Sequence, residues 1–568
     1  MKKNIFSLLS CAVAALVMSA CSLDRTPDDP NVFMDFNQDA VFSKIYATFA
    51  MPGQTGPNGD SDIDGIDGGT SAFYRMIWEL NEFPTDEGWW IWGDPGVADL
   101  RIMNWDAEND LVQGLYYRLF IDVTLCNHFL DRTEDMTDEK TLRQRAEVRF
   151  VRAINYYYLL DMFGQVPFSE HVTAEAPKTK TRVELYAWLE NELKELETLL
   201  PASRLSLYRV DKVAAQLLLA RLYLNAEVYT GTPHWSEAAK YAAEVMKSGY
   251  KLLSAPTDHT ATSGYKYSAY QKLFMGDNNV NGAENEAILM IYQDGNHCQA
   301  WGGARFLVCA FRDANWMPSG STDSWTCFRS SPEMVENFID LTTAATLQDH
   351  EYNMPALIGD DRAIFCSYYR YAEGTHKEWD PTIKDSIDVP NAHTWDLKGN
   401  GASELYDCWA ECKWTGVHST ANTPADYEGQ DPAWPDNDIP FLRVAEAYLT
   451  YAEAVYRGGN AVNGTAEAAI QALRDRANNT QPFTINDDFL LAEWSREFWL
   501  EGRRRIDLIR FGQFAGEGVT RNWEGRGNKK SGEAPKAMDK KYNIFPLPTS
   551  DVTANPNLAG INEANGYY

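Results

Sequence analysis

The stretch RAEVRFVRAINYYYLLDMFGQVPF, residues 145–168, decides the fold class of this 568-residue chain. Its apolar side chains recur at the spacing of one helix face, at Ala146, Phe150, Ala153, Ile154, Tyr157 and Leu160. Upstream, residues 137–139 (Thr-Asp-Glu) supply a capping residue and early acids, and downstream Gly164 and Pro167 end the pattern. We therefore expect a helix here with one buried face.

Three further helices are expected directly after this one. Thr181 and Glu184 form a capping box, Asp211 caps the next helix and Ser236 caps the one after it. The four helices form two pairs, and each pair leaves an apolar face that only a neighbouring pair can cover. The spacing is irregular and lacks a strict repeat signature, so we expect a tetratricopeptide-like scaffold of helix pairs.

Helical patterns return near the end of the chain. Asp438 and Pro440 are expected to open one helix, Thr465 to cap a second and Asp487 to open a third. The basic run at residues 503–505 (Arg-Arg-Arg) has two interpretations, an anion-binding site or ion pairs with the many acids of the chain. We favour structural ion pairs, because acids outnumber bases in this sequence.

These patterns predict a mainly α fold in one domain, residues 41–568. A helical part, 41–250, and a second helical part, 436–568, flank a loop-rich part, 251–435, rich in Gly, Asn, Asp and aromatic residues. An irregular region of this length is usually functional, so we expect it to carry a ligand site. Within it, residues 287–292 and 306–311 are expected to be short strands.

The amino terminus has the features of a bacterial lipoprotein signal. Two lysines precede an apolar run, residues 5–18, and LVMSAC at residues 16–21 resembles a lipobox. We expect residues 1–20 to be a signal peptide, Cys21 to be lipidated, and residues 21–40 to be the tether of a membrane-anchored protein. The alternative is an ordinary signal peptide that happens to contain a cysteine.

Composition excludes several classes of protein. The net charge of −30 disfavours a nucleic-acid partner, which needs clustered Lys and Arg to neutralise phosphate. The nine cysteines include no C-x-x-C pair, which disfavours a zinc site and leaves the disulfide state open. The sequence contains no G-x-S-x-G, H-E-x-x-H or phosphate-loop motif, so we expect no enzyme. Aromatic residues make up 13% of the chain, which favours a stacking surface in addition to a core.

A tryptophan cluster stands in the segment EGWWIWGDPGVADL, residues 87–100. The Gly and Pro residues that follow the cluster predict a loop or a strand end. In an extended segment Trp90 and Trp92 share one face and Trp89 points the other way. Two indoles beside acids suit a hydroxylated ring, whose CH face stacks while its hydroxyls are hydrogen-bonded. The alternative is burial in the core, which we expect for Trp89.

Several segments together resemble the SusD/RagB family of nutrient-binding lipoproteins at the surface of Bacteroidetes-type outer membranes. The resemblance covers nearly the whole mature chain in the right order, at residues 145–168, 219–226, 439–449, 496–508, 542–548 and 555–558. It implies a SusD-like fold and a non-enzymatic protein that binds glycan and passes it to a TonB-dependent SusC-like transporter. It also implies a lipid-anchored location at the cell surface.

The loops resemble those of the starch-binding founder of the family, which implies starch or malto-oligosaccharide as ligand. The resemblance places an arc of three aromatic residues on Trp90, Trp301 and Trp325, with a tyrosine in the founder at the position of Trp301. Trp92 is a flanking candidate. It also implies hydroxyl-binding roles for Asp67 and Arg75, and the founder's asparagine beyond the cluster falls on Asp94 or Pro95. The alternatives are another polysaccharide or an oligopeptide as ligand and, further away, a glycoside hydrolase.

Some family members bind calcium, which makes a structural calcium ion a candidate cofactor here. The oxygen-rich candidates lie around residues 277–286 and 436–438, and they are Asp277, Asn279, Glu284, Glu286, Asp436 and Asp438. The alternative is a solvated acidic loop without metal.

Overall fold

The helix predicted to open at residues 137–139 and to end at Gly164 is α6, Glu139–Met162, in the computed structural model of the chain. Asp138 is its N-cap and accepts a hydrogen bond from the backbone N–H of Thr141 at 3.0 Å. The structure describes residues 36–567 apart from 54–55, 58–60, 261–265, 312–318, 326, 341–342, 344–353, 367, 370–386, 389–409, 422–428, 524 and 529–535.

Most of the secondary structure is helical. The helices of the N-terminal part are α2 (Gln38–Ala50), α3 (Phe73–Glu82), α4 (Val97–Arg101), α5 (Asp110–Arg132), α6, α7 (Arg182–Leu199), α8 (Lys212–Leu224), α9 (Ala226–Thr230) and α10 (Trp235–Met246). Short helices follow, namely α11 (Ala269–Lys272), α12 (Ala304–Cys309), α13 (Pro332–Glu336) and α15 (Met354–Ile358). The C-terminal helices are α16 (Ala445–Tyr456), α17 (Ala466–Arg476), α18 (Asp487–Phe498), α19 (Arg504–Arg510), α20 (Thr549–Ala554) and α21 (Ile561–Ala564).

The strands are short and pair two by two in antiparallel fashion. The pairs are β1 (Gly88–Trp90) with β5 (Phe328–Ser330), β2 (Val166–Pro167) with β3 (Thr179–Lys180), β4 (Ala287–Ile291) with β10 (Ile439–Arg443), β6 (Phe365–Cys366) with β9 (Ala410–Glu411), and β7 (Tyr368–Tyr369) with β8 (Ile387–Asp388).

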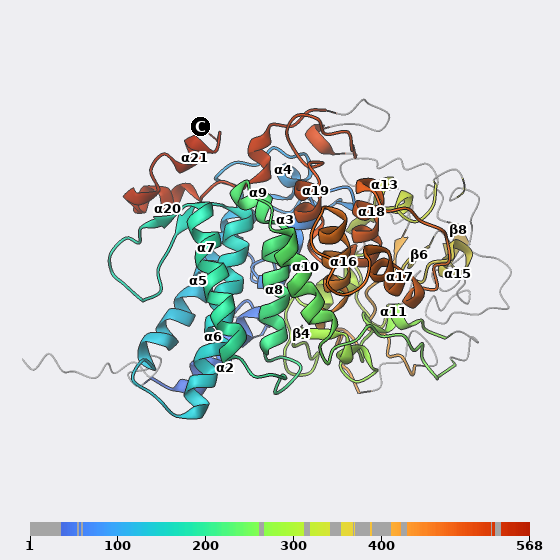
Figure 1. Cartoon of the computed structure of the whole chain (residues 1–568), viewed down its shortest axis with the longest axis horizontal. Coiled ribbons are helices and arrows are strands. Elements are labelled where there is room, and N and C mark those ends of the chain that lie inside the picture. Colours follow the sequence, from blue (N-terminus) through green and yellow to red (C-terminus); the bar gives the residue numbers. More distant parts are fainter. Residues whose placement is uncertain are drawn as a thin grey trace, which may run out of the picture. The chain divides into compact units, whose positions relative to one another are not determined.

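The long helices pack in a continuous row. Helix α6 packs on α5 and α7, α8 packs on α7 and α10, and α16 then packs on both α10 and α17 (Figure 1). The row begins in the N-terminal part and is extended by helices that lie two hundred residues later in the sequence. Described residues from Phe42 onward form one compact unit. Among the described residues, no helix combines the length and apolar character that crossing a membrane requires. The mainly helical, helix-pair fold predicted from the sequence is confirmed.

The predicted helix caps are mostly correct. Thr181 forms the capping box with Glu184, Asp211 accepts from the N–H groups at the start of α8, and Thr465 caps α17. Ser236 was expected to cap a helix, but it lies inside α10, which begins at Trp235 without a side-chain cap.

Two segments have the opposite secondary structure to the one expected. The helix expected to open at Asp438 and Pro440 is instead strand β10, and the following helix, α16, begins only at Ala445. Pro440 lies beside a register shift, where the absence of its N–H interrupts the ladder with β4. Residues 306–311 were expected to be a strand and lie mainly in α12, all of whose side chains are buried. A short, fully buried apolar run does not distinguish the two structures by its periodicity.

A buried network of ion pairs joins β10, α17 and α18 to Glu286 and Arg362. The guanidinium of Arg443 donates to Glu497 at 2.6 Å and approaches Glu286 at 3.1 Å. Arg476 also pairs with both of these carboxylates, and Arg362 reaches Glu497 at 3.4 Å. All five side chains are buried. Burial alone raises the pKa of Glu497, but the three arginines outweigh it and bring that pKa to about 2.

The arginine run at residues 503–505 is also structural, as predicted. Arg503 pairs with Asp507 at 3.0 Å, Arg504 with Asp86 at 2.7 Å, and Arg505 with Asp161 at 3.2 Å.

Replacing Glu497 with Ala should lower the free energy of unfolding by roughly 3–5 kcal/mol, the usual cost of breaking a buried ion pair from one side. The change leaves the guanidinium groups of Arg443 and Arg476 short of a charge partner in the interior. Urea denaturation followed by circular dichroism measures the loss. As a control, Lys247→Ala removes an exposed ion pair of 3.9 Å with Glu244 and should change the same quantity by less than about 0.5 kcal/mol. Equal effects of the two substitutions would contradict the interpretation.

Candidate functional site

Strand pairing brings the tryptophan cluster beside a distant loop. In the β1–β5 ladder Trp90 lies opposite Phe328, and the N–H of Ile91 donates to the carbonyl of Cys327 at 2.8 Å. Trp92 lies just beyond the ladder on one strand and Trp325 just before it on the other. Their ring centroids are therefore only 6.4 Å apart, with an interplanar angle of 35°.

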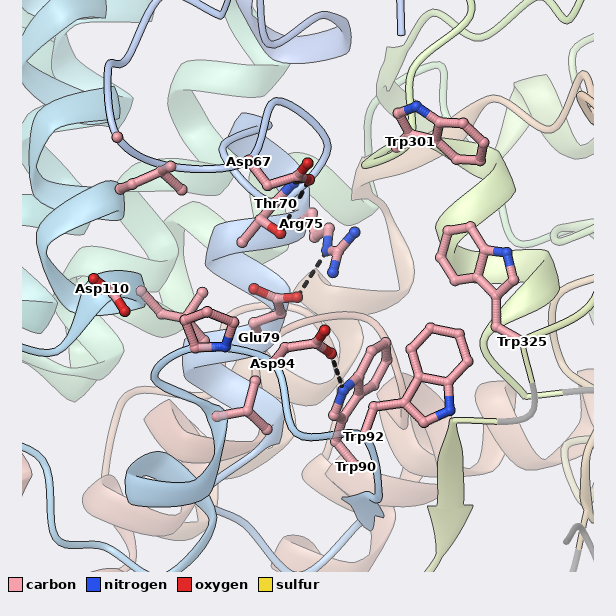
Figure 2. A pocket seen from close by; sticks show the side chains of 15 residues that line it. Asp67, Thr70, Arg75, Glu79, Trp90, Trp92, Asp94, Asp110, Trp301 and Trp325 are labelled. Atoms are coloured by element: carbon pink, nitrogen blue, oxygen red, sulfur yellow. Dashed lines mark hydrogen bonds and ion pairs between the residues drawn. The ribbon is translucent and has the colours of Figure 1, made fainter. Parts of the chain in front are cut away.

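The indoles continue beyond this pair as one series. Trp325 lies 6.3 Å from Trp301 at an interplanar angle of 39°, and Trp92 lies 6.0 Å from Trp90 at 76°. Figure 2 shows Trp92, Trp325 and Trp301 along one side of a cavity. The predicted convergence of separated tryptophans is therefore present, and Trp92 is a full member of the series. It stands between Trp90 and Trp325 instead of flanking the arc.

Two glycines allow the loop of Trp301 to approach the loop of Asp67. A Cβ atom on Gly302 would lie 2.3 Å from the carbonyl oxygen of Gly69, and one on Gly69 would lie 2.3 Å from the Cβ of Trp301. Such distances are too short for any side chain, so glycine is required on both sides of the contact.

The exposure of the three clustered tryptophans differs from the expectation. Trp92 is 40% exposed, whereas Trp90 is only 1% exposed because Phe83 and Phe306 pack against its ring. Trp89, expected in the core, is half-buried under the guanidinium of Arg101, which lies 4.2 Å from its ring centroid. The strand ends at Trp90, so only Trp92 extends past the buried ladder into solvent. Trp90 therefore supports the arc from behind, and Trp92, Trp325 and Trp301 present its open face.

Polar side chains face the indoles across the cavity (Figure 2). Arg75 and Glu79 stand one turn apart on α3, with Arg75 Nε 2.7 Å from Glu79 Oε1. Asp67 closes a turn by accepting from the N–H groups of Gly69 and Thr70, and its side chain is exposed. Asp94 accepts the indole N–H of Trp90 at 2.6 Å, which fixes the orientation of that ring.

All seven ligand-binding residues predicted from the sequence line one cavity of about 520 Å³. They are Asp67, Arg75, Trp90, Trp92, Asp94, Trp301 and Trp325. Pro95, the alternative to Asp94, also lines the cavity, together with seven residues that the sequence analysis missed, namely Gly65, Ile66, Thr70, Glu79, Val97, Asp110 and Leu111. Of these, Glu79 could have been found, since an acid four residues after Arg75 shares its helix face.

Burial changes the titration of Glu79. Desolvation raises the pKa of its carboxyl group from 4.5 to about 7, the nearby charges of Asp94 and Asp67 add to the rise, and Arg75 opposes it. One oxygen, Oε1, is bonded to Arg75, and the other is buried. The cavity therefore contains an acid that changes its charge near neutral pH.

The calcium site expected from the sequence stays a prediction. Among the described residues, no three acidic, histidine or cysteine side chains gather around a common point. The candidates are already engaged in the fold. Glu286 pairs with Arg443 and Arg476, Asp277 accepts from Ser419, and Asp438 accepts from Tyr208. Asp436 accepts from the N–H of Gly295, Glu284 accepts from the N–H of Gly282, and Asn279 lies in the same stretch.

Some predictions concern residues outside the described part of the chain. The signal peptide, residues 1–20, and Cys21 lie there. Cys126, Cys298, Cys309 and Cys327 are free thiols.

Comparison with known proteins identifies relatives of the whole chain. Residues 271–567 match the model of the SusD family, and residues 82–224 match a family described as starch-binding and associating with the outer membrane. The starch-binding protein SusD of Bacteroides thetaiotaomicron is 36% identical over 98% of both chains.

Solved structures share the fold. A SusD-like carbohydrate-binding protein from Bacteroides fragilis aligns with a TM-score of 0.63 and 19% identity, over 92% of this chain and 98% of that one. A surface glycan-binding protein from B. thetaiotaomicron, solved with laminarihexaose, aligns with a TM-score of 0.62 and 17% identity over the same shares of the two chains.

Glu79→Gln should raise the melting temperature relative to the wild type at pH 8, and the difference should shrink towards zero at pH 5. Because the folded protein holds the Glu79 proton up to about pH 7, ionisation weakens the fold as pH rises from 4.5 through 7. Glutamine imitates the protonated acid at every pH. Differential scanning fluorimetry across this range measures the effect. The exposed acid Glu108, changed to Gln, provides the control, and a pH-independent difference for Glu79→Gln would argue against the raised pKa.

Proposed function

This chain belongs to the SusD family, and we propose that it captures starch or malto-oligosaccharides at the cell surface and passes them to a SusC-like TonB-dependent transporter. As a SusD-like protein it binds glycan and is not an enzyme. The observation that supports starch as the ligand is the cavity in which three exposed or half-buried indoles face Asp67, Arg75 and Asp94.

The angles between the indoles favour a curved ligand. Neighbouring rings of Trp92, Trp325 and Trp301 are tilted by 35° and 39°, so the stacking surface turns from one ring to the next. A helical α-glucan presents a curved apolar face that follows such a surface, whereas an extended ribbon of sugars would need rings that are nearly coplanar. The carboxylates and the guanidinium opposite are suited to the hydroxyl groups on the outer edge of the glucan.

The contacts predict weak binding of a single short chain. Stacking of a nucleic-acid base on an aromatic ring contributes about 1–3 kcal/mol, and a sugar is expected at the low end of this range. Three contacts, less the cost of ordering the ligand, leave a modest affinity. A protein that transfers its ligand to a transporter benefits from such an affinity, because release is fast.

The lipid anchor is supported by the sequence and by the description of a matching family, whereas the transporter partner is proposed from the family alone. LVMSAC at residues 16–21 places a cysteine where a lipoprotein signal peptidase would leave it at the new N-terminus. One matching family is described as associating with the outer membrane. We propose acylation of Cys21, which mass spectrometry of the membrane-extracted protein would detect as the mass of the acyl chains.

Trp92→Ala and Trp325→Ala should each abolish retardation of the protein in an amylopectin-containing native gel. Each change removes one of the indoles on the open face of the arc, and the melting temperature should stay within a few degrees of the wild type. Tyr456→Ala is a matched control, because Tyr456 is 41% exposed, like Trp92, and lies on α16 away from the cavity lining. Unchanged retardation of both tryptophan variants would place the glycan elsewhere.

A panel of polysaccharides in the same gel tests the choice of ligand. Amylopectin and glycogen should retard the wild type more than laminarin, xyloglucan, xylan or mannan. Retardation by one of the latter polysaccharides but not by amylopectin would keep the family role and replace starch as the ligand.

A further inference from the structure

Two residues outside the cavity lining connect the indoles of the arc. Asp323 accepts the indole N–H of Trp325 at 3.1 Å through Oδ2, and the same oxygen forms an ion pair with Nη2 of Arg305. The guanidinium carbon of Arg305 lies 4.3 Å from the ring centroid of Trp301. One ion pair therefore joins the two indoles, by a hydrogen bond on one side and a cation–π contact on the other.

A third indole holds Arg305 in place. The guanidinium carbon lies 4.0 Å from the ring centroid of Trp434, and Trp434 lies 4.9 Å from Trp301. Arg305 stands on α12, where only 9% of its surface is exposed. Its planar head is thus confined between aromatic rings, so the position of Asp323 largely decides where Trp325 lies relative to Trp301.

The backbone alone does not fix the orientation of the Trp325 ring relative to Trp301. Trp301 and Trp325 lie on different loops. The backbone N–H of Trp325 donates to the carbonyl of Cys309 at 2.8 Å, which attaches its loop to the end of α12. That bond places the Cα of Trp325 but leaves its side-chain rotamers free. The hydrogen bond to Asp323 selects one of them.

We propose that the Arg305–Asp323 ion pair is a positioning device that sets the angle between Trp301 and Trp325 and thereby selects curved α-glucans. This inference rests on the proposed function. Neither residue is among those that line the cavity, and the contacts of the pair reach it through Trp325 and Trp301. Without the pair, Trp325 samples other rotamers, and a ligand that must touch both rings pays the cost of ordering them. A ligand short enough to use one ring pays little.

Asp323→Asn is the sharpest substitution, because the amide oxygen still accepts the Trp325 N–H while the charge that holds Arg305 is lost. Isothermal titration calorimetry with cyclomaltohexaose, a closed and rigidly curved ring, should show an affinity about tenfold below that of the wild type, or about 1.4 kcal/mol. Maltose, which covers a single indole, should bind within about threefold of the wild type. Asp323→Ala should lower the affinity for cyclomaltohexaose further, and Asp323→Glu, which keeps the charge, should bind more tightly than Asp323→Ala. Asp135→Asn, in the exposed loop between α5 and α6, is the control because it removes the same charge.

A spectroscopic readout separates positioning from general stability. Because the coupled indoles contribute to near-ultraviolet circular dichroism, Asp323→Asn should change the tryptophan bands of the free protein while leaving its melting temperature within a few degrees. If the ratio of the affinities for cyclomaltohexaose and maltose is the same in Asp323→Asn and Asp323→Ala as in the wild type, the inference is overturned and the proposed function is left intact. Equal losses for both ligands together with a lower melting temperature would also overturn it, since the pair would then be merely structural. Failure of the wild type to bind either α-glucan would overturn the proposed function itself, and this inference with it.

Discussion

The ion pair between Arg504 and Asp86 joins the N-terminal and C-terminal parts of the chain, and the geometry of the cavity depends on it. Arg504 Nε and Nη2 donate to the two oxygens of Asp86 at 2.7 and 2.9 Å across 418 residues. Burial acts to raise the pKa of Asp86, but Arg504 and Arg521 hold it well below its usual range, so the carboxylate stays charged at neutral pH. Glu87 adds a second link by accepting the N–H of Leu500 at 3.0 Å. The segment between α3 and β1 is therefore held by α19 and the loop before it.

This connection matters because the same segment supports both sides of the cavity. Helix α3 presents Arg75 and Glu79, and β1 presents Trp90 and leads directly to Trp92. A buried ion pair adds little net stability compared with apolar packing, since both charges lose their hydration. Its effect is instead on uniqueness, because Arg504 donates to both oxygens of Asp86 and to the carbonyl of Leu491 in this one arrangement. The helical row provides a stable base, and the ion pairs fix the position of the segment that carries the site.

The sequence predicted more of the site than of the local structure around it. The helix within residues 145–168, the caps at Thr181 and Asp211, and seven of the residues that line the cavity were predicted, since each depends on local chemistry or on a family pattern. The strand β10 was mistaken for a helix because its partner, β4, lies about 150 residues earlier, and pairing at that distance leaves no periodic mark in a five-residue run. The exposure of Trp90 was wrong for a similar reason. The alternation of side chains along an extended segment correctly placed Trp90 on the same face as Trp92. Phe83 and Phe306, which cover the ring of Trp90, belong to other segments.

The orientations of the indoles explain how a small arc can bind a flexible polymer at all. Each buried or half-buried ring in the free protein is already restrained by a polar contact. Asp94 holds the N–H of Trp90, Asp323 holds that of Trp325, and Arg305 packs on the face of Trp301. Trp92 is the exposed exception, and it rests between two of these restrained rings. The aromatic side chains thus lose their conformational entropy during folding. Binding then costs mainly the conformational entropy of the ligand. An acidic, weakly binding surface can then select a glycan by the fixed angles between its rings, without a large contact area.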